Sequence, residues 1–144
     1  MSRKVLVAYD SSPSSKQAVK EAKNQAKLVA GTEVHLVSFV KTPGPSANAV
    51  IAKSIENEMM ENFQIELEEV EAEFKAEGIP FVKDMIIKNP QSNFGKKVCE
   101  YAENEAVNLI IAGSRGLGNM KKLILGSVSN NIVQNTKCPV MIIK

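Results

Sequence analysis

Short apolar runs alternate along the chain with longer segments in which apolar residues recur every three or four positions. The apolar runs are typical of strands covered on both faces, and they lie at residues 5–9, 34–40, 81–87, 109–112 and 140–143. The segments between these runs have the apolar spacing of amphipathic helices, and they lie at residues 18–30, 55–74, 94–102 and 128–133. This order predicts a single domain over residues 1–144, a parallel, doubly wound α/β sandwich.

Polar and glycine positions mark where the predicted helices begin and end. Residues 10–15 offer N-cap oxygens and a proline suited to a first helical turn, and Gly31 stops the pattern that follows. The helical segment at residues 55–74 and its flanks hold nine of the 16 acidic residues. Because these glutamates occupy the faces away from the apolar stripe, the acidic run is most simply a solvated surface.

Composition excludes several classes of protein and site. A chain of 144 residues with 44% hydrophobic and 24% charged residues is neither disordered nor a disulfide-stapled miniprotein. Cys99 and Cys138 lie far apart and His35 is the only histidine, which argues against a zinc site of cysteine and histidine. The chain has few aromatic residues, which argues against a surface that stacks the bases of single-stranded nucleic acid. No apolar run is long enough for a signal peptide or a membrane-spanning helix. We therefore expect a cytoplasmic protein without membrane or nucleic-acid partners.

A glycine-rich stretch from Gly113 to Gly126 is the strongest candidate for chemistry. Glycines let backbone N–H groups approach an anion closely, and Gly126 opens a helix whose free N–H groups and dipole favour phosphate. Hydroxyl donors and positive charges accompany it: Ser127, Ser129, Arg115, Lys121 and Lys122. Taken alone, the same stretch is equally well explained as turn glycines followed by a helix cap.

Two familiar phosphate signatures are absent from the sequence. A Walker A loop needs lysine and then serine or threonine after its last glycine, whereas Asn119 follows Gly118. A dinucleotide-binding GxGxxG belongs after the first strand, where the chain has Tyr9 and Asp10. A P-loop NTPase and a hydride-transfer enzyme are therefore disfavoured.

The spacing Gly-x2-Gly-x9-Gly-Ser, followed by Val-Ser, resembles the nucleotide-binding signature of the universal stress protein family. The likeness covers the whole chain in four pieces: Val5-Leu-Val-Ala-Tyr-Asp10-Ser-Ser, Asn108-Leu-Ile-Ile-Ala-Gly-Ser-Arg-Gly-Leu-Gly118, Leu125-Gly-Ser-Val-Ser129 and Cys138-Pro-Val-Met-Ile-Ile-Lys144. The resemblance implies a five-stranded parallel sheet of order 3-2-1-4-5 with helices on both faces, the Rossmann-like fold shared with adenine nucleotide hydrolases. It also implies a homodimer and, because the glycine signature is complete, the ATP-binding branch.

The resemblance also assigns roles to particular residues. Asp10 would hydrogen-bond the ribose, and backbone around Ala8, Tyr9 and Phe39 would line the adenine slot. The phosphates would be wrapped by Gly113, Arg115, Gly116, Gly126, Ser127, Val128 and Ser129. Mg²⁺ would accompany ATP, held by phosphate oxygens and water rather than by protein side chains. Capping of the first helix is the alternative role for Asp10.

Two positions depart from the family pattern, although neither touches the glycine signature. Residues 88–90 read Lys-Asn-Pro where many relatives carry Gly-Asp, and Asn108 stands where aspartate is frequent.

Near the C-terminus, Pro139 opens an apolar strand, which fits a sheet edge. Since an apolar edge invites pairing, we expect dimerisation through Val140–Ile143.

Three functions follow as hypotheses. The first is a small cytoplasmic stress-response module that binds ATP with little or slow hydrolysis; a slow ATPase or autophosphorylating enzyme is a variant of it. No general base is evident in the glycine stretch, so we expect binding without fast turnover and name no catalytic residue. The second is a nucleotide-free dimeric interaction protein. The third is an enzyme of the related adenine nucleotide hydrolases. Such an enzyme would be expected to have a Ser-Gly-Gly loop after the first strand or a His-x-Gly-His element, and the sequence contains neither.

Overall fold

The computed structural model describes residues 2–40, 48–87, 93–114 and 125–144. Along the chain they form β1 (Arg3–Tyr9), α1 (Pro13–Leu28), β2 (Thr32–Val40), α2 (Ala49–Ala76), β3 (Phe81–Ile87), α3 (Phe94–Asn104), β4 (Leu109–Gly113), α4 (Ser127–Asn135) and β5 (Val140–Ile143). The five strands make one sheet in the order β3-β2-β1-β4-β5, and all neighbouring strands are parallel. The predicted sheet order is confirmed.

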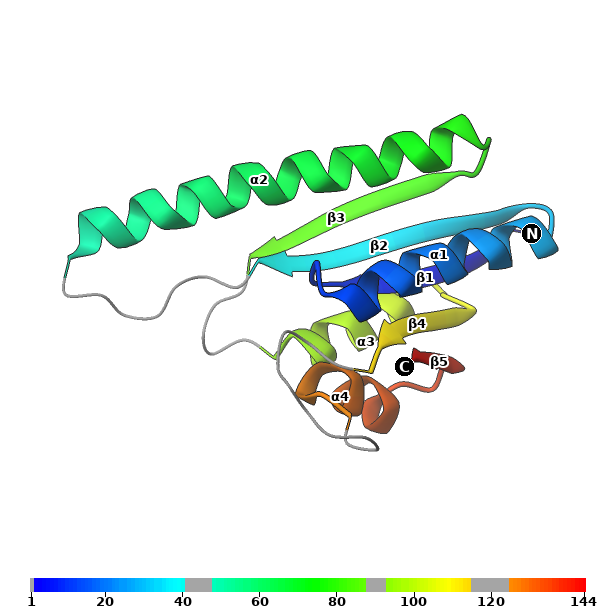
Figure 1. The fold of residues 1–144 in the computed structure, drawn as a ribbon. Coiled ribbons are helices and arrows are strands. Elements are labelled where there is room, and N and C mark those ends of the chain that lie inside the picture. The colour runs from blue at the N-terminus through cyan, green and yellow to red at the C-terminus, as the bar shows by residue number, and fades with distance from the viewer. Residues whose placement is uncertain (1, 41–47, 88–92, 115–124) are drawn as a thin grey trace.

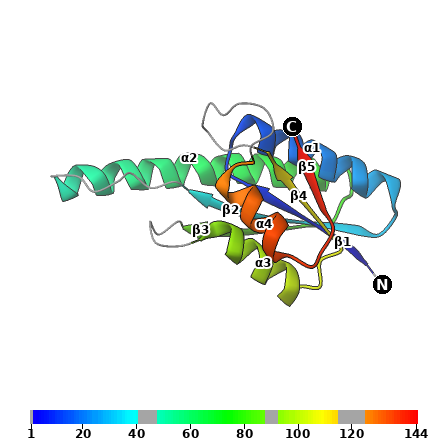
Figure 2. The same cartoon turned by 90° about the horizontal axis from the view of Figure 1, so that it is seen from below.

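Two apolar cores lie on opposite faces of the sheet. Successive residues of a strand point to opposite faces, so Val5, Val7 and Tyr9 pack against α1 and α2, while Leu6 and Ala8 pack against α3 and α4. Figure 2 shows the two helical layers with the sheet between them. Because β1 is covered on both faces, its side chains from Val5 to Tyr9 are all buried, as the continuous apolar run predicted.

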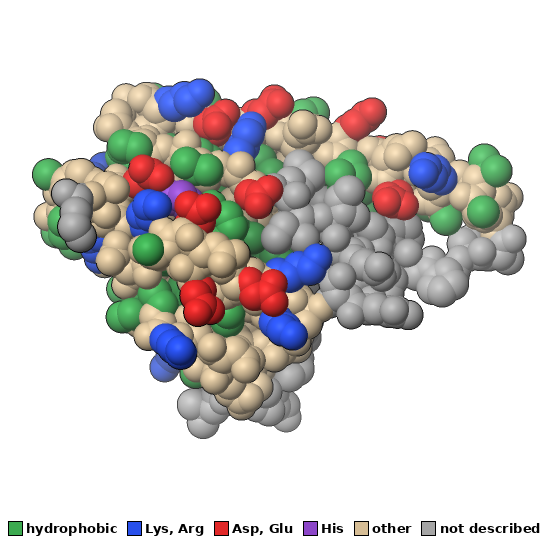
Figure 3. Space-filling model, turned by 180° about the vertical axis from the view of Figure 1, so that it is seen from behind, with side chains coloured by type: hydrophobic (Ala, Val, Ile, Leu, Met, Phe, Trp, Pro, Cys, Tyr) green, Lys and Arg blue, Asp and Glu red, His purple; other side chains and the backbone are tan. Residues whose placement is uncertain are grey.

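Helix α2 runs well past the carboxyl end of β3 (Figure 1). Its apolar stripe is buried at Phe63, Leu67 and Phe74 and continues onto the projecting part, where Ile51 and Ile55 are 54% and 43% exposed. The helix begins before residue 55 because the side chain of Asn48 accepts hydrogen bonds from the N–H groups of Val50 and Ile51. Figure 3 shows green apolar side chains at this projecting end.

Close helix packing explains one glycine outside the glycine-rich stretch. A Cβ on Gly95 would lie 2.6 Å from Cβ of Asn131 and 2.9 Å from the carbonyl oxygen of Val128. Gly95 therefore lets the first turn of α3 press against α4. Asn93 caps α3 through the N–H of Lys96.

Candidate functional site

The candidate site lies at the carboxyl ends of β1 and β4, which are neighbours in the middle of the sheet. Ala8 stands opposite Ala112, so the turn after Tyr9 and the turn after Gly113 leave the same edge of the sheet. The connection after β1 leads to β2 on one side, whereas the connection after β4 leads to β5 on the other side. The strand order therefore reverses between β1 and β4. Ligands bind at such switch points in open α/β sheets.

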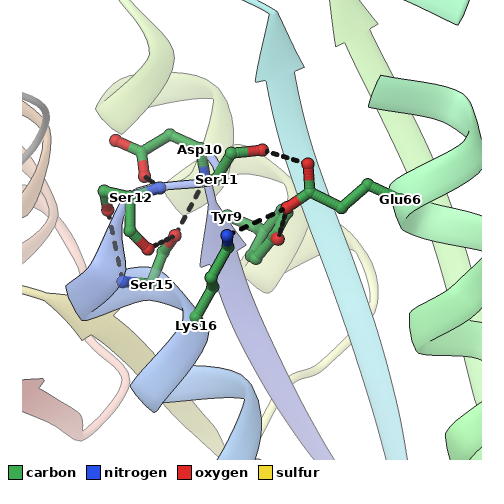
Figure 4. Close-up of polar contacts among 7 residues, drawn as sticks. All are labelled: Tyr9, Asp10, Ser11, Ser12, Ser15, Lys16 and Glu66. Carbon is green, nitrogen blue, oxygen red and sulfur yellow. Dashed lines mark hydrogen bonds and ion pairs between the residues drawn. The ribbon is translucent and has the colours of Figure 1, made fainter. Parts of the chain in front are cut away.

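Asp10 lies in the turn between β1 and α1, held by a network of backbone and serine groups (Figure 4). Its Oδ1 accepts a hydrogen bond from the N–H of Ser12 at 2.9 Å, while its own N–H donates to Oγ of Ser15 at 3.4 Å. The N-cap of α1 is Ser12, whose Oγ accepts from the N–H of Ser15 at 3.2 Å. Asp10 thus closes the turn before the helix rather than capping the helix, and its Oδ2 has no partner among the described residues.

A carboxylate from α2 reaches the same turn. Glu66 accepts hydrogen bonds from the hydroxyl of Tyr9 and, at 2.9 Å, from Oγ of Ser11, and Nζ of Lys16 lies 4.0 Å away. Burial raises the pKa of the Tyr9 hydroxyl well above its ordinary range, and the hydrogen bond to Glu66 raises this pKa further. Tyr9 therefore stays a neutral donor at physiological pH.

Sequence reasoning missed Glu66 because it is one of nine glutamates interpreted as a solvated face. A signal did exist: Glu66 lies next to the buried Leu67 and three positions after the buried Phe63, beside the apolar stripe of α2. A glutamate beside the inner stripe of an amphipathic helix has polar partners within the fold, since an unpaired charge there is unfavourable.

The first turn of α4 faces the same edge of the sheet. Gly126 is its N-cap, and by helix geometry the N–H groups of Ser127, Val128 and Ser129 have no acceptor within the helix. The N–H of Gly126 donates to the carbonyl of Ser114 at 2.8 Å, which ties the start of α4 to the end of β4. These N–H groups, which have no acceptor within the helix, and the helix dipole form a surface that suits an anion.

The two serines of this turn differ in what their hydroxyls can do. Ser127 is exposed, whereas Ser129 is 3% exposed and its hydroxyl donates to the carbonyl of Gly126 at 3.1 Å. The hydroxyl of Ser129 also lies 3.4 Å from the carbonyl of Ser114. Ser127 therefore has the available hydroxyl, while Ser129 can offer an anion its backbone N–H.

Gly113 has a packing role that its place in the glycine signature did not reveal. A Cβ at this position would lie 2.2 Å from Oγ and 2.8 Å from Cβ of Ser14, in the first turn of α1. The missing side chain lets α1 approach β4 closely at the site.

The structure brings most of the predicted residues to one edge of the sheet. Tyr9 pairs in register with Ser38, which places Phe39 on the strand beside Asp10. The side chains of Ala8 and Phe39 point into the core shared with α3, and the ring centroids of Phe39 and Phe94 are 4.1 Å apart. Any contact of Ala8 and Phe39 with a ligand would therefore come from their backbone.

Some of the predicted positions lie outside the described residues, namely Arg115, Gly116, Lys121, Lys122 and Lys88. Asn108, the other departure from the family pattern, fixes the start of β4. Its Oδ1 accepts from the N–H of Lys4 at 2.8 Å, and its N–H donates to the carbonyl of Lys4 at 2.9 Å.

The remaining candidate side chains lie away from this edge. His35 is buried between Glu33 and Tyr101. Cys99 and Cys138 are half-buried, and this burial raises the pKa of both thiols. Within the described ranges, no three acidic, histidine or cysteine side chains converge as metal ligands. None of the helices among those residues is long and apolar enough to cross a bilayer.

The sheet order and the two helical layers define a Rossmann-like α/β domain. The chain belongs to the universal stress protein family, whose profile matches residues 1–144. A universal stress protein of Thermus aquaticus is 30% identical over 145 residues, covering all of both chains.

Solved structures share the fold. The structure of MJ0577 from Methanocaldococcus jannaschii superposes with a TM-score of 0.83 at 26% identity, covering 100% of this chain and 96% of that one. A universal stress protein in complex with cAMP superposes with a TM-score of 0.66 at 22% identity, covering 99% of this chain and 96% of its own.

Proposed function

We propose that this protein is a regulatory module that binds an adenine nucleotide, ATP accompanied by Mg²⁺, at the carboxyl edge of its sheet. The observation that carries the proposal is the convergence of Asp10 and the open first turn of α4 on the switch point between β1 and β4. A carboxylate suits sugar hydroxyls and a helix N-terminus suits phosphate, so the two features together fit the two ends of a nucleotide. The cAMP complex of a family member supports the choice of an adenine nucleotide.

Each residue then has a role. Asp10 accepts from the ribose through its Oδ2, and backbone of Ala8, Tyr9 and Phe39 lines the adenine. The N–H groups of Ser127, Val128 and Ser129 and the hydroxyl of Ser127 bind phosphate, together with Gly113, Arg115, Gly116 and Gly126. Since no cluster of metal ligands occurs among the described residues, Mg²⁺ would be bound through phosphate oxygens and water.

Binding with little or slow hydrolysis is the activity that these residues favour. Asp10 already holds the turn through Oδ1 and His35 is buried elsewhere, so neither is placed as a general base. We assign no catalytic residue. We further propose a cytoplasmic homodimer joined through Val140–Ile143, the strand at one edge of the sheet.

One observation favours a second function, the recruitment of a protein partner without nucleotide. The projecting part of α2 exposes Val50, Ile51 and Ile55, and Val50 is 78% exposed. Such residues are typical of contact surfaces when they lie together.

A calorimetric titration with Mg-ATP tests the proposed function. The φ of Gly126 is −62°, which any residue adopts, so Gly126→Val should fold normally while its side chain crowds the phosphate position. We expect binding by the natural protein and an affinity at least about tenfold weaker in Gly126→Val, a loss of about 1.4 kcal/mol.

A control substitution in the same helix separates crowding at the phosphate from a general effect on α4. Gln134→Val introduces the same branched side chain at an exposed position in the last turn and should bind Mg-ATP normally. Failure of the natural protein to bind would refute the proposed function. Equal affinity in Gly126→Val would show that the phosphates lie elsewhere.

A further inference from the structure

Tyr9 and Ser11, the residues on either side of Asp10, both donate hydrogen bonds to one carboxylate. The hydroxyl of Tyr9 donates to Oε1 of Glu66, and Oγ of Ser11 donates to Oε2 at 2.9 Å (Figure 4). Glu66 lies 55 residues from Ser11 along the chain, in a helix of its own. A single side chain of α2 therefore fixes both neighbours of Asp10.

Ser11 has a backbone conformation that needs such support. Its φ is +69°, in the left-handed region that glycine adopts freely and other residues rarely adopt. Residues in this region persist where surrounding contacts hold them. The hydrogen bond from Oγ of Ser11 to Glu66 is such a contact, and the change of direction at Ser11 is what brings the N–H of Ser12 back to Oδ1 of Asp10.

Glu66 is itself held firmly in place. It lies between the buried residues Phe63 and Leu67, and its side chain is 30% exposed. The ring of Tyr9, which is 1% exposed, packs beside that of Phe63 with 6.0 Å between centroids. Lys16, 4.0 Å from Oε1, supplies a positive charge on the open side.

We propose that Glu66 is a positioning residue of the nucleotide site. Through Tyr9 and Ser11 it holds the turn after β1 so that Asp10 presents Oδ2 to the ribose. Glu66 acts on the turn and does not touch the ligand. This inference rests on the proposed function for its ligand, while the effect of Glu66 on the turn exists without any ligand.

Three substitutions test the role of Glu66. Glu66→Ala removes both acceptors and should weaken Mg-ATP binding about tenfold, because a left-handed serine is then unsupported. Glu66→Gln keeps an amide oxygen for Tyr9 and an amide N–H for Ser11, so it should retain most of the affinity. Adding Ser11→Gly to Glu66→Ala should restore binding, since glycine adopts the same φ without support. Glu69→Gln, at an exposed position of the same helix, is the matched control.

Comparison of ATP with 2′,3′-dideoxy-ATP shows whether the effect passes through Asp10. The natural protein should prefer ATP, and Glu66→Ala should lose that preference, whereas general loosening of the fold would weaken both nucleotides alike. Equal preference in Glu66→Ala and the natural protein, or no recovery on adding Ser11→Gly, would overturn the proposed role.

Hydrogen exchange in the absence of nucleotide separates this inference from the proposed function. The amide of Ser12, bonded to Asp10, should exchange about tenfold faster in Glu66→Ala and return toward its natural rate when Ser11→Gly is added. If the natural protein binds no nucleotide, the proposed function fails and the positioning of the ribose fails with it. An exchange rate of the Ser12 amide that is the same in Glu66→Ala and in the natural protein would instead refute the proposal that Glu66 stabilises the turn.

Discussion

At the scale of single residues, the buried side chain of His35 has one polar partner on a distant element and one on its own strand. His35 on β2 contacts the hydroxyl of Tyr101 on α3 through Nδ1 at 2.7 Å, and its Nε2 lies 2.5 Å from Oε1 of Glu33. In the part of the chain that the structure describes, every buried side-chain nitrogen and oxygen has a partner. Such pairing offsets the desolvation of these groups and fixes how α3 sits on the sheet.

Tyr101 makes this arrangement sensitive to alkaline pH. Burial first, and then the negative charges of Glu105, Asp84 and Glu33, together raise the pKa of Tyr101 from 10.0, the value for an ordinary tyrosine, to about 12. The unfolded chain therefore loses this proton at lower pH than the folded protein. The stabilisation is complete below about pH 10 and disappears as the pH rises toward 12.

We therefore expect the free energy of unfolding to fall with pH above 10, and less steeply in Tyr101→Phe. Urea denaturation at a series of pH values measures both slopes. The raised pKa of Tyr9 acts in the same direction, so some decline should remain in the variant. Identical slopes in the two proteins would contradict the assigned environment of Tyr101.

At the scale of elements, the edge strand β5 leaves part of its backbone unpaired with the sheet. The carbonyls of Pro139 and Ile143 accept from Ile110 and Ser114 on the side of β4, at 2.9 and 2.7 Å. Backbone direction alternates along a strand, so the N–H groups of Val140 and Ile142 point away from β4. These are the groups through which a second copy of the chain would pair in the proposed homodimer.

Ile142→Pro removes one of these outward N–H groups and leaves the bonds to β4 in place, as proline is tolerated at a sheet edge. We expect its dimer dissociation constant to rise at least about tenfold. Ile142→Ala loses the same packing but keeps the N–H, and should dimerise as the natural protein does. Sedimentation equilibrium decides: a proline variant that dimerises normally would exclude β5 as the interface.

The sequence predicted the type and order of the nine elements that the structure describes, because apolar runs and helical spacing depend directly on which residues are buried. Boundaries were harder: β2 begins at Thr32, since its first residues pair with β1, and α2 begins at Ala49, since Asn48 caps it. Both depend on hydrogen bonds that the hydrophobic pattern does not record.

The candidate site was predictable only in part. Asp10 and residues 126–129 were predicted from the resemblance to the family's motifs; Asp10 directly follows β1, and the start of α4 is hydrogen-bonded to the residue after β4. The packing of Gly113 on Ser14, the inward hydroxyl of Ser129 and the contribution of Glu66 each depend on contacts between elements far apart in sequence. Such contacts leave no local pattern.

At the scale of the whole molecule, the proposed nucleotide site can be compared with a second hollow among the described residues. The proposed site is the carboxyl edge of the sheet, with Asp10 and the first turn of α4. The second hollow is a pocket between α3 and α4, lined by Cys99, Asn131 and Cys138 among others. The pocket combines amides, thiols and charges of both signs, whereas the sheet edge combines a carboxylate with free helix N–H groups, which suits a nucleotide better.

The most direct test is to follow backbone amide chemical shifts of the isotopically labelled protein during titration with Mg-ATP. The proposed function predicts the largest changes at residues 9–12 and 126–129, and small changes around Cys99 and Asn131. Changes confined to the pocket between α3 and α4, or no saturable change at all, would contradict a nucleotide site at the edge of the sheet.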